Sequence, residues 1–199
     1  MMTELWIATG NKGKLGEFKL LFDRELPNCK LHSIADLPTF SAPPENGQSF
    51  LDNARIKARS LKAMKPGQWI MAEDSGLEVE GLGNLPGIHS ARYAGPKASE
   101  SENVAKLLKM MQIRQIANRS ARFFCCMVVY TPEGEELVFN GELKGQIGKA
   151  PAGKHGFGYD PVFIPEGESQ TLAELGSGYK ANHSHRARAT MSFISKIKA

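Results

Sequence analysis

The chain has 199 residues, 41% hydrophobic and 23% charged, which is the composition of an ordinary globular domain. Its formal charge of +4 is too small to indicate nucleic-acid binding by itself, and no apolar run approaches the roughly 20 residues that span a bilayer. Three cysteines, at positions 29, 125 and 126, offer neither a disulfide framework nor zinc-ligand spacing, and the N-terminus shows no secretory pattern. We therefore expect a cytoplasmic protein.

The first half of the chain predicts alternating strands and helices. Apolar spacing and proline content predict a strand at 5–8, a helix at 14–22, a strand at 30–35, a loop at 38–47 and a helix at 49–64. Ser49, followed by Asp52, is a plausible N-terminal cap for the last of these.

The second half adds a hairpin to this pattern. The predicted elements are short strands at 69–72 and 77–79, a helix at 99–111, strands at 121–130 and 135–147 joined by a turn at 132–134, and a helix from about 184 towards 197. Ser75-Gly76 is predicted to break the first strand. Mixed strands and helices with a hairpin indicate an α/β or α+β sheet that is not wholly parallel.

Residues 71–95 carry two adjacent acids, Glu73 and Asp74, at the end of an apolar strand. Such charges are costly there without a counter-charge or a metal. Neighbouring strand residues point to opposite faces, so both cannot face one metal unless the strand has ended. Asp74 is the better inward candidate, and Glu45 in the preceding loop is a possible partner at a Mg²⁺ site. The alternative is two exposed acids at a strand end.

Two motifs that precede the acids in the sequence have residues suited to binding phosphate. Residues 9–14, Thr-Gly-Asn-Lys-Gly-Lys, join a strand to a helix, where glycines, helix-start N–H groups and lysines favour phosphate oxygens. Their spacing is not that of a P-loop, so an ordinary turn is the alternative. Asn53 and Lys57 are four apart and share a helix face. Lys57 gains a function only if that face borders the same site.

Two motifs near the C-terminus suit a base or an anion. Glycines flank Phe157 within residues 153–161, so its ring can stack on a nucleobase or pack into the core. Lys180, His185 and Arg186 lie just before and at the start of the last predicted helix. From Lys180 onward there are five Lys or Arg and no acid, which fits either a solvated face or a basic wall facing an anion.

Taken together and in order, the motifs resemble the inosine triphosphate pyrophosphatase family. The matching strings, which span residues 9–189, are TGNKGK, SFLDNARIKA, AEDSGLEV, LPGIHSARYAG, FGYDPVF and YKANHSHRARA. The resemblance implies one domain over 1–199, an elongated mixed α/β sheet with flanking helices and two lobes around a nucleotide cleft. It also implies a homodimer that hydrolyses ITP, dITP and XTP with Mg²⁺ to the monophosphate and pyrophosphate, cleansing the nucleotide pool, with no stable nucleic-acid partner and no membrane partner.

The resemblance also implies roles for single residues. Asp74 and Lys57 would be catalytic, and Asp74, Glu45 and Glu73 are the candidate metal ligands. The implied substrate-binding residues are Thr9, Gly10, Asn11, Lys12, Gly13, Lys14, Asn53, Ser75, Phe157, Gly158, Tyr159, Asp160, Lys180, His185 and Arg186. The chain departs from the family at Pro44, where a second loop acid is often found. Which acid holds the metal and which handles the water stays open.

Two other classes of function are alternatives. One is a nucleotide phosphohydrolase that releases orthophosphate, which product analysis distinguishes. The other is a basic nucleic-acid-binding protein that uses the C-terminal helix, which predicts salt-sensitive binding. The second alternative leaves the acidic segment 71–95 without a role.

Overall fold

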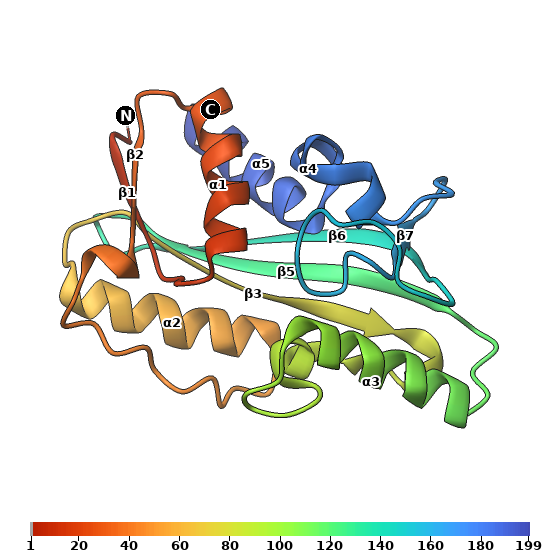
Figure 1. Ribbon diagram of the computed structural model, residues 1–199. Coiled ribbons are helices and arrows are strands. Elements are labelled where there is room, and N and C mark those ends of the chain that lie inside the picture. The colour runs from red at the N-terminus through yellow and green to blue at the C-terminus, as the bar shows by residue number, and fades with distance from the viewer. Residues whose placement is uncertain (1) are drawn as a thin grey trace. The chain divides into compact units, whose positions relative to one another are not determined.

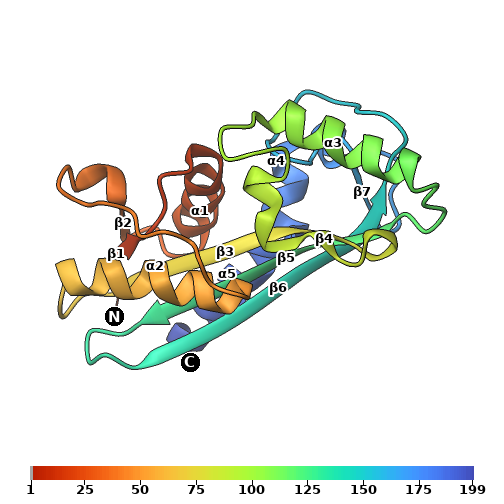
Figure 2. The same ribbon diagram turned by 90° about the horizontal axis from the view of Figure 1, so that it is seen from below.

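The computed structural model describes residues 2–199 (Figure 1, Figure 2). Within them, seven strands form one sheet in the order β2-β1-β3-β5-β6-β7, and β4 pairs with β3. The strands are β1 (Glu4–Ile7), β2 (Lys30–Ser33), β3 (Ile70–Val79), β4 (Leu85–Pro86), β5 (Ser120–Tyr130), β6 (Glu136–Ile147) and β7 (Phe163–Pro165). The helices are α1 (Lys12–Glu25), α2 (Phe50–Met64), α3 (Glu100–Ile113), α4 (Leu172–His183) and α5 (His185–Lys198), with 3₁₀ turns at Ile34–Asp36, Glu80–Leu82 and Gly87–Arg92.

The sheet is mixed, as the sequence predicted. β1 runs parallel to β2 and β3, whereas β4 is antiparallel to β3 and β7 is antiparallel to β6. In the described part of the chain, none of the helices has the length and hydropathy needed to cross a membrane.

The chain divides into two compact units. Unit 1 comprises residues 1–74, 125–141 and 186–199, and unit 2 comprises residues 75–124 and 142–185. The predicted single domain with two lobes around one cleft stays a prediction.

In unit 1, helices cover both faces of the sheet (Figure 1). α1 and α5 pack on one face, where Phe18 and Phe193 join Met71 in one apolar cluster. α2 packs on the other face, where Ala58 joins Ala72 in a second cluster. Because successive strand residues point to opposite faces, β3 is apolar on both sides here, and this explains its unbroken run of hydrophobic residues before the acids.

In unit 2, α3 and α4 contribute to one apolar core. Leu107 of α3 and Leu172 of α4 join Leu77, Phe123 and Phe163 from the strands. This core holds the loops of unit 2 that carry several of the predicted site residues.

The predicted break in β3 is wrong, because the strand continues through Ser75 and Gly76 to Val79. A glycine weakens a strand by about 0.5–1 kcal/mol but does not end it. Burial of Leu77, whose N–H donates to Ser90 Oγ at 2.9 Å, supports the continuation.

The predicted cap of α2 is confirmed, because Ser49 accepts a hydrogen bond from the Asp52 N–H. Ser99 forms a capping box with Glu102 at the start of α3. α4 was not predicted, and Lys180, which was placed before a helix, lies in its last turn.

Candidate functional site

Glu73 and Asp74 follow one another on β3 and bind different elements of unit 1. Glu73 Oε1 lies 2.8 Å from Lys14 Nζ and 3.1 Å from Arg186 Nη2. Asp74 Oδ1 lies 3.0 Å from Lys57 Nζ of α2. Because the strand does not end between them, the two carboxylates point to opposite faces of the sheet.

Asp74, Lys57 and Glu45 form one charged cluster in unit 1. The Lys57 ammonium lies 3.0 Å from Asp74 Oδ1 and 2.7 Å from Glu45 Oε1, so two carboxylates converge on one cation. Burial raises the pKa of Asp74, while the nearby Lys57 lowers it less. Burial lowers the pKa of Lys57, but the charges of Asp74 and Glu45 outweigh it, and the net pKa is raised. Lys57 therefore stays a cation at neutral pH.

Asn53 is the buried, uncharged member of this cluster. It is fully buried on α2, its Nδ2 donates to Asp74 Oδ2 at 3.2 Å, and its Oδ1 accepts from the Gly47 N–H at 2.9 Å. Its predicted role was a substrate contact. In the protein alone, both ends of the amide are hydrogen-bonded to protein groups, and the substrate contact stays a prediction.

The predicted phosphate loop is the capped start of α1. Asn11 Oδ1 accepts from the Lys14 N–H at 3.0 Å, and Thr9 Oγ1 accepts from the Asn11 N–H at 3.2 Å. The first turn of this 14-residue helix has no acidic residue, and Lys12 is exposed beside it. A helix N-terminus that has lysines and no acidic residue in its first turn favours an anion.

Glu73 is buried on the opposite face of β3 in unit 1, where Lys14 and Arg186 both contact it. The charges of Arg186 and Lys14 hold the pKa of its carboxyl well below the usual value, although burial acts in the opposite direction. The Cys125 thiol, 3.7 Å away, donates to Glu73 Oε2. Glu73 therefore remains ionised and serves as a counter-charge.

Arg186, which the sequence predicted to read the base, lies in a buried ion-pair network of unit 1. Its side chain is only 1% exposed, and its guanidinium is bound to Glu73 and Glu17 within unit 1. Arg186 therefore neutralises the buried Glu73 and the half-buried Glu17, and its predicted base-reading role stays a prediction. Glu17, one turn after Lys14 on α1, was missed, although the spacing of three residues places both on one helix face.

In unit 2, three predicted residues from two motifs come together. Lys180 Nζ lies 2.6 Å from Asp160 Oδ2 and 4.3 Å from the centroid of the Phe157 ring. The same Asp160 oxygen accepts from the Phe157 N–H at 2.9 Å. Gly156 has φ +79°, and a side chain there would collide with the Asp160 carboxylate, so this loop requires glycine.

The neighbouring residues fix this cluster. The Tyr159 hydroxyl donates to the Ser90 carbonyl at 2.8 Å, and burial raises the pKa of Tyr159. Phe157 and Gly158 line a cavity of about 490 Å³ with α3, a volume within the range of small-molecule sites. His185 is buried and stacks on Phe123 with 4.9 Å between ring centroids.

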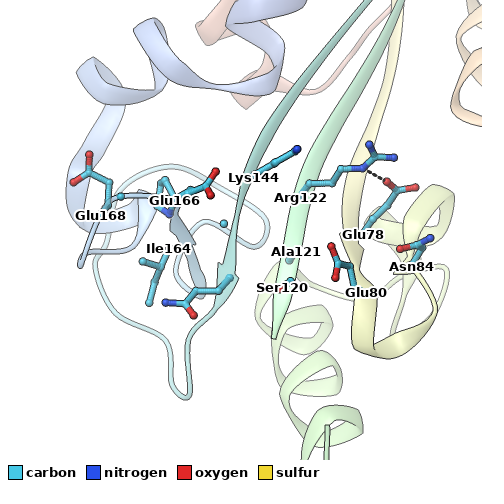
Figure 3. A pocket seen from close by; sticks show the side chains of 14 residues that line it. Glu78, Glu80, Asn84, Ser120, Ala121, Arg122, Lys144, Ile164, Glu166 and Glu168 are labelled. Carbon is cyan, nitrogen blue, oxygen red and sulfur yellow. Dashed lines mark hydrogen bonds and ion pairs between the residues drawn. The ribbon is translucent and has the colours of Figure 1, made fainter. Parts of the chain in front are cut away.

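A larger hollow of about 680 Å³ in unit 2 contains none of the predicted site residues (Figure 3). Its wall carries charges of both signs, including Glu78, Lys144 and Glu166. Arg122 points toward Glu78 and binds it at 2.6 Å (Figure 3). Because the hollow contains none of the predicted site residues, we assign it no role in the predicted chemistry, although it is the larger of the two.

Comparisons with known proteins agree with the order of the motifs. Residues 5–196 match the sequence model of the Ham1 family. A Bdellovibrio bacteriovorus protein named dITP/XTP pyrophosphatase is 64% identical over 195 residues, which are 98% of each chain. A Streptococcus thermophilus protein of the same name is 40% identical over 98% of this chain, which spans 60% of that longer protein. The solved structure of a HAM1 protein from Coxiella burnetii superposes with a TM-score of 0.87 at 33% identity, covering 100% of this chain and 99% of that one.

Proposed function

We propose, because this chain belongs to the Ham1 family, that it is a nucleoside triphosphate pyrophosphatase acting on non-canonical purine nucleotides. Its substrates are ITP, dITP and XTP, and its products are the nucleoside monophosphate and pyrophosphate. The observation that carries this proposal is the convergence of Glu45 and Asp74 on the Lys57 ammonium. Such a cluster can hold both a metal and a phosphate chain.

A Mg²⁺ ion fits the pair Glu45 and Asp74. Both carboxylates lie within 3.0 Å of the Lys57 nitrogen, and one metal ion can bind between them once the Lys57 ammonium turns to the phosphates. Mg²⁺ is commonly held by one or two carboxylates together with waters and substrate phosphates. Within residues 2–199, no three His, Cys, Asp or Glu side chains form a metal cage by themselves, so waters and substrate phosphates would have to complete the coordination. Bound there, Mg²⁺ would neutralise charge on the pyrophosphate leaving group.

The protein's own groups supply the remaining chemistry in unit 1. The N-terminus of α1, with Thr9, Gly10, Asn11, Lys12, Gly13 and Lys14, binds the triphosphate. Lys57 supplies positive charge to the phosphates, and positioning with electrostatics provides most of the rate in such transfers. A carboxylate that binds metal is a weaker base, so we assign to Asp74 the orientation of the attacking water. Glu73 holds Lys14 in place and is not a metal ligand in this proposal.

Base recognition is assigned to unit 2. Phe157 offers a ring for stacking, and Gly158, Tyr159 and Asp160 form the loop beside it. Lys180 and His185 are the proposed donors to the C6 carbonyl of hypoxanthine or xanthine. Adenine carries an amine there and would leave such donors without a partner, which disfavours ATP by about 10⁴-fold. Ser75, half-buried after Asp74, is kept as a substrate contact.

The cellular setting is part of the proposal. We place the enzyme in the cytoplasm as a homodimer that acts on free nucleotides, without a stable nucleic-acid partner or a membrane partner. Removal of deaminated purine triphosphates there would protect nucleic-acid synthesis from them.

The test is a panel of ITP, dITP, XTP, GTP and ATP with Mg²⁺, with pyrophosphate and orthophosphate measured separately. We expect one pyrophosphate per monophosphate, and kcat/KM for ITP or XTP about 10⁴-fold above that for ATP. Orthophosphate as the product would establish a different phosphohydrolase. Salt-sensitive DNA or RNA binding without turnover would support the nucleic-acid alternative.

A further inference from the structure

Asn53 joins the two acidic parts of the cluster in unit 1. Its Nδ2 donates to Asp74 Oδ2, while its Oδ1 accepts from the N–H of Gly47, two residues after Glu45. Lys57 makes the second link, since it binds Asp74 Oδ1 and Glu45 Oε1. The loop and the strand acid are thus connected twice, once through a neutral amide and once through a cation.

The close approach at Gly47 is an independent sign of this link. A Cβ at position 47 would lie 2.7 Å from Asn53 Oδ1 and 2.6 Å from the Cβ of Asp52. Only glycine lets the loop backbone come this near to α2. The backbone of the loop therefore packs directly against the Asn53 amide.

Asparagine is suited to this position by its hydrogen-bonding groups. One amide supplies a donor for a carboxylate and an acceptor for a backbone N–H, without charge. An aspartate in its place would put a second carboxylate against Asp74, and an aliphatic residue would satisfy neither partner. With no exposed surface, the side chain has the rigidity that a supporting group requires.

We propose that Asn53 is a positioning residue that fixes Asp74 relative to the Glu45 loop, so that both carboxylates can bind one divalent cation. It does not contact the substrate. This inference rests on the proposed function for the identity of the two ligands. Groups that orient metal ligands typically change metal affinity or activity by about 10- to 100-fold when removed.

The first experiment measures Mn²⁺ binding to the nucleotide-free protein by electron paramagnetic resonance, with Mn²⁺ standing in for Mg²⁺ because both prefer oxygen ligands. Asn53→Leu should raise the Kd for Mn²⁺ by about 10- to 100-fold. Its Mg²⁺ requirement in turnover should rise in parallel, while KM for ITP at saturating Mg²⁺ stays within about threefold of the wild type.

Asn103→Leu is the matched control. Asn103 is also a buried helical asparagine, and it bridges the Ala94 N–H and the Ala91 carbonyl in unit 2. It should leave the Kd for Mn²⁺ unchanged even if it lowers stability. An equal change in both variants would mean a general packing effect and would overturn the proposal.

Gly47→Ala is a second route to the same result, and it serves if Asn53→Leu does not fold. It should weaken Mn²⁺ binding in the same direction, because it displaces the loop from the amide. A raised KM for ITP with an unchanged Kd for Mn²⁺, in either variant, would make Asn53 a substrate contact and refute the inference. If the wild type binds Mn²⁺ but releases no pyrophosphate, the proposed function fails while the Mn²⁺ comparison still decides the role of Asn53.

Discussion

The two adjacent acids on β3, Glu73 and Asp74, are neutralised by different cations, and we assign them different roles for that reason. Lys14 and Arg186 neutralise Glu73, whereas Lys57 and Asn53 hold Asp74. Sequence alone predicted that neighbouring strand residues point apart, but it could not tell whether the strand had ended. The partner of Glu73 on α5 lies more than a hundred positions along the chain, and no local spacing reveals such a pair.

At Asp74, the conservative change Asp74→Asn removes the charge and keeps the shape. We expect kcat for ITP to fall by about 10²–10⁴-fold, because an amide neither binds Mg²⁺ as well nor orients water as a carboxylate does. Asp23→Asn, which alters an exposed aspartate of α1, is the control and should be near wild type. Steady-state pyrophosphate release checks this, and near-normal turnover would remove Asp74 from the mechanism.

At Arg186, the change to alanine tests a structural role. Arg186→Ala leaves Glu73 and Glu17 without their shared counter-charge, and breaking a buried ion pair costs about 3–5 kcal/mol. Lys196→Ala, at an exposed position of the same helix, should change the unfolding free energy by about 0.5 kcal/mol or less. Urea unfolding measures both. Equal values would contradict the counter-charge role of Arg186.

Among the elements, those with a clear apolar period were predicted, whereas α4 and the short strands β4 and β7 were not. The spacing of Phe18 and Phe22 identified α1, and the turn before Glu136 identified the β5–β6 hairpin. α4 escaped notice because Gly176, which has φ +80°, interrupts its pattern. Its capping box, Thr171 with Glu174, was the signal that could have located it.

The two capping boxes should differ in their contribution to stability. Ser99→Ala at α3 should lower the unfolding free energy by about 1 kcal/mol, the usual cost of losing a cap. Thr171→Ala at α4 should lower it by about 2 kcal/mol, because the buried hydroxyl also donates to the Ala152 carbonyl at 2.8 Å. Urea titrations of the two variants give the comparison. A smaller loss at Thr171 than at Ser99 would refute the argument.

In the whole molecule, the proposed chemistry is divided between the two units. The residues around Asp74 that we propose for metal and phosphate belong to unit 1, and those around Lys180 that we propose for the base belong to unit 2. The order of the motifs along the sequence located both groups of residues. The order of the motifs could not assign the two groups of residues to different units, because each unit is built from several separate segments of the chain. The division is visible only in the fold.

This division predicts that a change in unit 2 alters substrate choice more than turnover. Lys180→Met removes an ammonium donor and keeps the apolar stem against Phe157. We expect the ratio of kcat/KM for ITP to that for ATP to fall by about tenfold or more, since a lost donor removes the penalty for adenine. Asp74→Asn should lower both values and leave their ratio unchanged.

The ratio is the right measurement because Lys180→Met also breaks the buried pair with Asp160 and should lower stability. A partly unfolded preparation reduces both kcat/KM values by the same factor, so the ratio reports only on the folded enzyme. Lys149→Met, which alters an exposed lysine of unit 2 that does not line the cavity beside Phe157, is the control and should preserve the ratio. If Lys180→Met also preserves it, Lys180 supports the loop through Asp160 and does not read the base.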